Sequence, residues 1–200
     1  MKNNDISKGE KTMLTAIILS APGPLATGIP AILSRSATQI ADFIRRTTEL
    51  IAIIISWQVY KKIHQRDEDF DYKEKLVRIS KMAVTIAMVL TGITMFSIGI
   101  ARFFTNDVSG KVALGLFTAI IATVFNTFFS LKYKALARDF NNPIIKGQYK
   151  LYKAKAYVDV VVVIALATVF IAPKSELARY VDAIGCIAVA IYLLYNGIKG

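Results

Sequence analysis

Two apolar stretches of the sequence carry ionisable residues at spacings that suit ion pairing. In the first stretch, residues 40–50 read IADFIRRTTEL and contain four charged side chains, Asp42, Arg45, Arg46 and Glu49. Asp42 and Arg46 lie four positions apart, as do Arg45 and Glu49, so both pairs can meet along one helix. We interpret this stretch as half of a candidate transport or ion-pair site.

The second stretch, residues 146–159, reads KGQYKLYKAKAYVD. Lys155 and Asp159 form a further pair four positions apart, and Gln148 precedes them. Three more lysines share one helical face and are candidates to contact an anion or a lipid phosphate: Lys146, Lys150 and Lys153. The tyrosines of this stretch offer hydroxyl groups and rings: Tyr149, Tyr152 and Tyr157.

The composition identifies the elements that must position these charges. Of the 200 residues, 54% are hydrophobic and 20% are charged, and the mean hydropathy is +0.48. Apolar runs of about 18 residues or more predict membrane spans, and helices are the spanning form that fits their length. We therefore expect an all-α, polytopic membrane protein with six transmembrane helices. The predicted spans are residues 13–33, 37–60, 79–101, 112–131, 144–171 and 181–198.

These spans predict a single transmembrane domain over residues 1–200, with no cytoplasmic C-terminal domain. The first span contains Pro22, Pro24 and Pro30, which predict a kinked or broken helix. The polar residues 61–78 between the second and third spans predict a solvated connector.

Basic residues indicate the orientation. Lys and Arg gather mainly in the segments on the side of both termini, and basic loops face the cytoplasm. We expect a multi-pass protein of the cell membrane with both termini cytoplasmic. The net charge of +11 then belongs to loops near the bilayer, so the lipid bilayer is the expected partner and nucleic acid is not.

The two charged stretches are predicted to lie at a similar depth in the membrane. At ~1.5 Å per residue, Glu49 lies ~18 Å from the outer start of its span, and Lys155 and Asp159 lie ~16 Å and ~22 Å from the cytoplasmic start of theirs. Buried charges at such depth pair or face water. We expect an ion-pair ladder between the second and fifth spans. The alternative is that each charge pairs within its own helix or faces water.

The chain resembles the transmembrane domain of the cation diffusion facilitators, which export zinc, manganese, iron or related divalent ions in exchange for protons. Three segments carry the resemblance: SRSATQIADFIRRTTEL, NNPIIKGQYKLYKAKAYVD and YVDAIGCIAVAIYLLYNGIKG. They are similar to the family's second, fifth and sixth spans, with Asp182 opening the last apolar helix. The resemblance covers nearly the whole chain and implies a six-span bundle with cytoplasmic termini. It also implies a homodimer, to which the sequence adds only the small-residue pairs Ser97/Ala101 and Gly115/Ala119.

The resemblance implies positions for the family's metal ligands, and this chain departs from the pattern there. The four ligand positions fall on Arg45, Glu49, Leu151 and Lys155, and the accompanying acidic positions fall on Asp42 and Gln148. Arginine has no lone pair to donate, and Lys155 would have to be neutral to bind a metal. Zinc requires three or four N, S or O ligands. His64 and Cys186 are the single residues of their types, and we expect no metal site and no cofactor.

Three functions remain open. In the first, the chain is a transporter on a cation/proton antiport scaffold whose buried charge cluster handles an anion. In the second, it is a transporter whose carboxylates exchange protons or monovalent ions. Alternatively, it is a non-transporting relative in which the former site is a structural ion-pair lock, acting as a membrane partner or lipid-binding protein. No enzymatic activity is expected, because the sequence offers no activated nucleophile pair, phosphate loop or redox centre.

Overall fold

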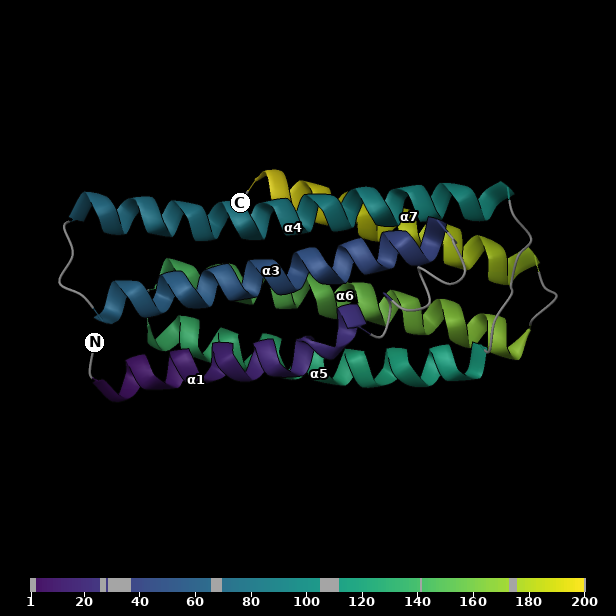
Figure 1. The fold of residues 1–200 in the computed structure, drawn as a ribbon. Helices are drawn as coiled ribbons and strands as arrows, with labels where there is room; N and C mark the ends of the chain where they lie inside the picture. The colour runs from purple at the N-terminus through teal and green to yellow at the C-terminus, as the bar shows by residue number, and fades with distance from the viewer. Residues whose placement is uncertain are drawn as a thin grey trace.

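The computed structural model describes residues 3–25, 28, 37–65, 70–104, 112–140, 142–172 and 176–199. Within these residues the chain forms six long helices and no strand. They are α1 (Asn3–Ser20), α3 (Ala37–Gln65), α4 (Phe70–Phe104), α5 (Val112–Asp139), α6 (Pro143–Ile171) and α7 (Glu176–Ile198). The helices lie side by side and alternate in direction, which gives one elongated bundle (Figure 1). The predicted all-α class with six helices is confirmed.

The first helix is interrupted where the prolines begin. α1 ends at Ser20, Ala21 forms a turn, and residues 22–25 are helical again. Proline lacks the backbone N–H that a helix interior needs, which explains the break beside Pro22. α1 begins at Asn3, ahead of the predicted span that starts at residue 13.

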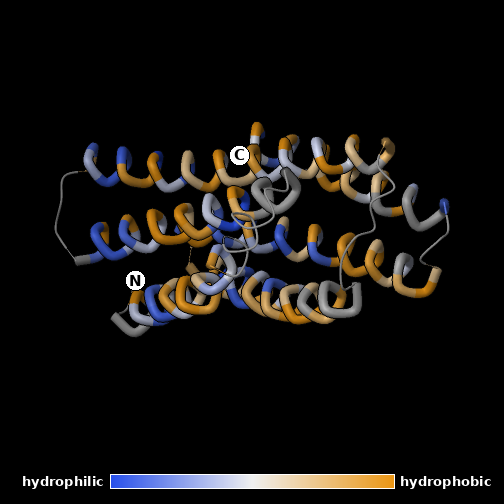
Figure 2. The backbone as a smooth tube through the Cα atoms, turned by 45° about the vertical axis from the view of Figure 1, so that its right-hand side comes forward, coloured by the Kyte–Doolittle hydropathy of each residue, from blue (hydrophilic) through white to orange (hydrophobic). Residues whose placement is uncertain are grey.

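The predicted connector over residues 61–78 is helical in its described parts, residues 61–65 and 70–78. α3 continues to Gln65 and α4 already begins at Phe70. Glu74 and Arg78 form an exposed i,i+4 ion pair at 3.5 Å, and such pairs stabilise helices in water as well. Figure 2 shows the hydrophilic residues gathered at this end of the bundle, where α3 ends and α4 begins. Polarity thus predicted exposure of the segment but not its backbone conformation.

The helices pack in pairs, most extensively α4 with α7 and α5 with α6. Glycines on α4 allow its backbone to approach α7 closely. A Cβ atom at Gly99 would lie 3.1 Å from the carbonyl oxygen of Ala183, and one at Gly92 would lie 3.3 Å from that of Ala190. Small residues at such positions are typical of helix pairs in membranes.

The outer surface of the bundle is apolar. On α4 the exposed large side chains recur every three or four positions: Ile79, Met82, Ile86, Leu90, Ile93, Phe96 and Ile100. Soluble monomers rarely expose so much contiguous apolar surface. Among the described residues, one helix, Phe70–Ala101, is long and apolar enough to cross a membrane, judged by length and composition alone. Ala183–Ile198 is a shorter apolar helix. We call the end where α1, α4 and α6 begin the inner end, because it is the end predicted to face the cytoplasm.

Candidate functional site

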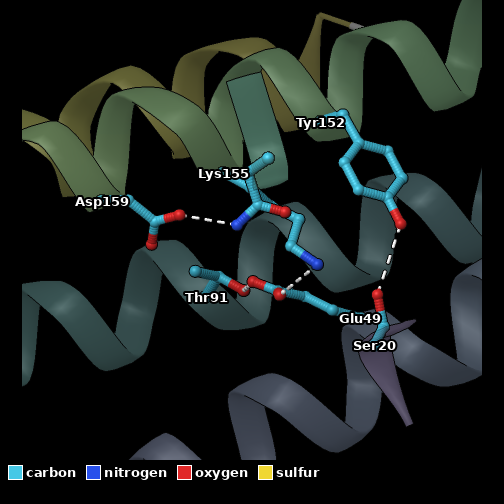
Figure 3. A network of polar contacts seen from close by, with 7 residues as sticks. Ser20, Glu49, Thr91, Tyr152, Lys155 and Asp159 are labelled. Carbon is cyan, nitrogen blue, oxygen red and sulfur yellow. Dashed lines mark hydrogen bonds and ion pairs between the residues drawn. The ribbon is translucent and has the colours of Figure 1, made fainter. Parts of the chain in front are cut away.

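An ion pair joins α3 and α6 in the interior of the bundle. The Nζ of Lys155 lies 3.1 Å from Oε2 of Glu49, and their side chains are only 13% and 7% exposed. Figure 3 shows the two side chains reaching toward each other. The depth estimate from the sequence places both at one level, and in the structure they are in contact. Because an unpaired buried charge is very costly, each residue makes the burial of the other tolerable.

α4 supplies a further contact to the same carboxylate. The buried hydroxyl of Thr91 donates a hydrogen bond of 3.4 Å to Oε1 of Glu49. Glu49 therefore has a cation at one carboxylate oxygen and a hydroxyl at the other (Figure 3). Thr91 could not be identified from the sequence, because threonine in an apolar helix ordinarily bonds the carbonyl four residues back.

Asp159 lies one turn from Lys155 on α6, and it accepts a hydrogen bond from another helix. The side-chain amide of Asn126 on α5 donates to Oδ2 of Asp159 at 2.6 Å. The sequence predicted a pair between Lys155 and Asp159, whereas Lys155 salt-bridges to Glu49. A single Asn in an apolar span could have indicated a buried polar contact, and that signal was missed.

A cavity of about 240 Å³ opens beside the ion pair, between α1, α3, α5 and α6. Its polar wall is formed by Ser20, Arg45, Arg46, Glu49, Asn126, Lys155 and Asp159. Apolar residues of α1 and α5, including Leu19, Ile121 and Phe125, complete it. A water molecule needs only ~15 Å³, so the cavity has room for several waters or a small solute. Among the described side chains of the wall, three cations accompany two carboxylates, an excess of one positive charge.

The two arginines of α3 both line this cavity and are half-buried. Each makes further interactions within the protein. The side chain of Asp42, the predicted partner of Arg46, lies outside the described residues, as does that of Asp182.

Aromatic residues border the cavity on the side of the inner end. Phe129 forms part of its wall, and the ring of Tyr152 lies 5.2 Å from that of Phe129 and stacks at 5.2 Å on Tyr133. The Nζ of Lys155 lies 5.0 Å above the ring of Tyr152, in a cation–π contact. The Tyr152 hydroxyl is 3.4 Å from the Ser20 hydroxyl of α1 (Figure 3). Of the three tyrosines that the sequence singled out, Tyr152 is thus the one at the site.

Gln148 and Leu151 lie on α6 between the ion pair and the inner end. Leu151 is buried in the core, and Gln148 is completely buried. Among the described residues, neither Oε1 nor Nε2 of Gln148 has a hydrogen-bond partner. A buried amide left unpaired costs free energy, so packing alone does not explain this residue.

The remaining predicted contacts are spread over the surface. Lys146 and Lys150 are exposed near the start of α6 and line a second cavity. Lys153 is half-buried, with its Nζ 5.8 Å from the ring of Tyr157. Ser97 and Ala101, one of the predicted dimer contacts, are exposed on α4, while the burial of Gly115 in the second predicted contact lies outside what the structure describes.

The residues at the site do not suit a divalent metal. In the part of the chain that the structure describes, no group of three or more His, Cys, Asp or Glu side chains could hold a metal ion. Of the positions implied by the resemblance, Leu151 is apolar, Arg45 cannot ligate, and Lys155 already neutralises Glu49. The lining cations would repel a divalent cation.

A bundle of six helices with an apolar exterior and a charged interior is the architecture of a transmembrane transport domain. The sequence from residue 13 to residue 199 matches the family model of the cation efflux transmembrane domain. The chain therefore belongs to the cation efflux family, that of the cation diffusion facilitators, and it is a membrane protein resembling a cation transporter. A comparison with curated proteins found no match.

Proposed function

We propose that this chain is a transporter that moves a small anion, in place of a bare divalent metal, through the cavity beside Glu49 and Lys155. One observation carries the proposal: the ion pair borders a cavity of about 240 Å³ whose wall also contains both arginines. Arginine and lysine side chains in a water-accessible cavity within a low-dielectric bundle attract anions strongly.

The chemistry of the cavity favours an anion over a monovalent cation. Arginine presents a planar fork of donors that fits carboxylate, sulfonate or phosphate oxygens. Arg45 and Arg46 both line the cavity and have five N–H donors each, so each can contact a substrate in addition to its interactions within the protein. The apolar side chains of Leu19, Ile121 and Phe125 opposite them suit an anion with a small hydrocarbon part.

The Glu49–Lys155 pair supplies a means of coupling to protons. A proton on the Glu49 carboxylate removes its charge and releases the Lys155 ammonium to bind the substrate anion. A proton and an anion then enter the site together without net charge, which limits the cost of burying either one. The substrate continues toward the inner end past Gln148, whose buried amide offers one donor group and one acceptor.

The test is uptake by the purified protein in liposomes, with chloride, phosphate and benzenesulfonate as probes and zinc as the comparison. We expect uptake of at least one anion and no uptake of zinc. Arg46→Gln and Lys155→Gln should each reduce anion uptake at least about tenfold, which equals a loss of about 1.4 kcal/mol of transition-state stabilisation. The matched control is Arg138→Gln, an exposed residue at the inner end of α5. Zinc uptake, or anion uptake that is unchanged in both variants, would refute the proposal.

A structural lock is the second candidate function, and the close, poorly exposed ion pair favours it. A lock predicts no uptake of any probe ion, with sodium and potassium included to test monovalent-cation exchange. It also predicts that Glu49→Leu with Lys155→Leu leaves a folded protein that keeps its membrane partners. Transport predicts instead that this apolar double variant folds but moves nothing.

We also propose the finer topology, with both termini cytoplasmic. On a Cys186→Ala background, Lys75→Cys lies in the exposed first part of α4 and Phe104→Cys at its exposed far end. In intact cells a membrane-impermeant thiol reagent should label Phe104→Cys and spare Lys75→Cys. The reverse labelling would invert the topology.

A further inference from the structure

A second cavity lies at the inner end of the bundle, away from the ion pair. It has a volume of about 300 Å³ and is formed by α4, α6 and α7. Three exposed lysines border it, Lys81 from α4 and Lys146 and Lys150 from α6. The rest of its wall is mainly apolar and includes Val84, Met88 and Pro143. We call this cavity the basic groove, because it combines cations with a hydrocarbon surface.

By the predicted spans, the lysines of the basic groove lie within reach of lipid phosphates. Lys81 and Lys146 each lie two residues inside the inner ends of their predicted spans, 79–101 and 144–171. Lys150 is about 6 Å deeper along α6. A lysine at such depth extends its ammonium group to the interface while its stem stays against apolar surface. The three ammonium groups can therefore converge on one phosphate.

The start of α6 adds positive potential to the same place. α6 begins at Pro143, capped by Asn142, and its first turn contains Lys146 and no acidic residue. The amino end of a helix carries a partial positive charge and favours anions there. This helix has lysines near the end where its dipole disfavours cations. A bound anion would offset the repulsion between these lysines and the positive end of the helix.

Gly147 keeps the apolar wall of the groove open. A Cβ atom at this glycine would lie 3.9 Å from Cγ2 of Val84, the one neighbour within ordinary contact distance. A larger side chain would consequently extend into the groove without a backbone clash. Asn196 from α7 contributes a side-chain amide at the other side.

We infer that the basic groove binds an anionic phospholipid of the surrounding bilayer. Its phosphate lies among Lys81, Lys146 and Lys150, and the upper part of an acyl chain lies along Val84 and Met88. Charge complementarity accounts for the headgroup, and the apolar wall accounts for the chain, which a free phosphate ion would leave unfilled. This site shares no residue with the transport cavity, and the inference does not depend on the proposed function.

The test is lipid retention by the full chain in detergent, measured by native mass spectrometry with phosphatidylglycerol or phosphatidylcholine. Wild type should retain phosphatidylglycerol in preference to phosphatidylcholine. A basic residue near an anionic lipid surface contributes about 1 kcal/mol, so each Lys→Gln change should weaken phosphatidylglycerol binding about fivefold. The triple change Lys81→Gln, Lys146→Gln and Lys150→Gln should weaken it on the order of a hundredfold.

Two further variants keep the test decisive. The matched control Lys132→Gln, Lys134→Gln and Arg138→Gln removes three exposed cations from the inner half of α5 and should leave lipid retention unchanged. Gly147→Leu fills the apolar wall without changing charge and should weaken retention even if the triple variant does not fold. Equal retention in wild type and Gly147→Leu, equal loss in the control, or displacement of the lipid by millimolar inorganic phosphate would overturn the inference.

Discussion

The helix pairs α3–α6 and α4–α7 cross the same bundle but are held together by different forces. Between α3 and α6 the principal contact is the salt bridge of Glu49 with Lys155 beside an open cavity. Between α4 and α7 the backbones meet at Gly92 and Gly99, with buried Ala183 and Ala190 opposite. The first pair has buried charges and an open cavity at its contact. The second pair meets through small residues at Gly92 and Gly99, and the basic groove lies nearer its inner end.

The two interfaces therefore have different roles. The α3–α6 interface holds the reactive polar groups, and the α4–α7 interface makes the bundle rigid. Charges in a membrane interior cost free energy and persist where function or pairing compensates them. Close contacts between small residues gain dispersion energy and leave no space for a solute. Substitutions at the two interfaces should therefore fail in different ways.

The largest effect is expected for Lys155→Ala, which leaves the Glu49 carboxylate without its cation. We expect the free energy of unfolding to fall by about 3 kcal/mol, the lower end for a broken buried pair, because cavity water can reach the carboxylate. The double change Glu49→Leu with Lys155→Leu should recover most of that loss. Denaturant unfolding in detergent should give a coupling free energy above ~1 kcal/mol between the two positions. Additive losses would show that the pair contributes no coupling.

Gly99→Leu should have the next largest effect, through steric conflict at the α4–α7 interface. The new side chain meets the backbone of Ala183, which cannot move aside as a flexible side chain would. Overpacking of this kind costs about 1–3 kcal/mol. Ser97→Leu on the exposed face of the same helix is the control and should change stability by less than ~0.5 kcal/mol. Equal thermal stability of both variants would contradict the close approach of the two helices.

Gln148→Leu should separate stability from transport. Removing a buried, unpaired amide should leave stability unchanged or raise it by up to ~1 kcal/mol. Under the proposed function, uptake should fall, because the route toward the inner end loses its polar group. Lys153→Gln on the same helix should alter neither property. A stability loss above ~1 kcal/mol would show that the amide has a structural partner.

The smallest effect is expected when zinc is added to the purified protein. Titration of the purified protein with zinc or cadmium should reveal no saturable site, since Glu49 is the one usable ligand at the positions implied by the family. Isothermal calorimetry of wild type and Glu49→Gln should give the same result. A stoichiometric site lost in Glu49→Gln would require ligands that the donor set does not provide.

The sequence was sufficient for the helical class and the family, because apolar runs and the order of three segments depend on local composition. It also placed Glu49 and Lys155 at one depth, since rise per residue is nearly constant along a helix. It could not identify Thr91 or Asn126, because a single hydroxyl or amide in an apolar span has no periodic signature. The helical course of residues 70–78 was missed for a related reason, as exposed polar residues suit a helix and a loop equally.

The glycine contacts between α4 and α7 also bear on how the bundle could change shape. Because the two backbones approach each other closely at Gly92 and Gly99, we expect α4 and α7 to move together. Any opening of the bundle would then occur at other helix interfaces, including the one between α3 and α4. The hydrogen bond from Thr91 to Glu49 crosses that interface. Movement of the α4–α7 unit would stretch this bond, so the ionisation and pairing of Glu49 would set part of the energy needed for the bundle to open.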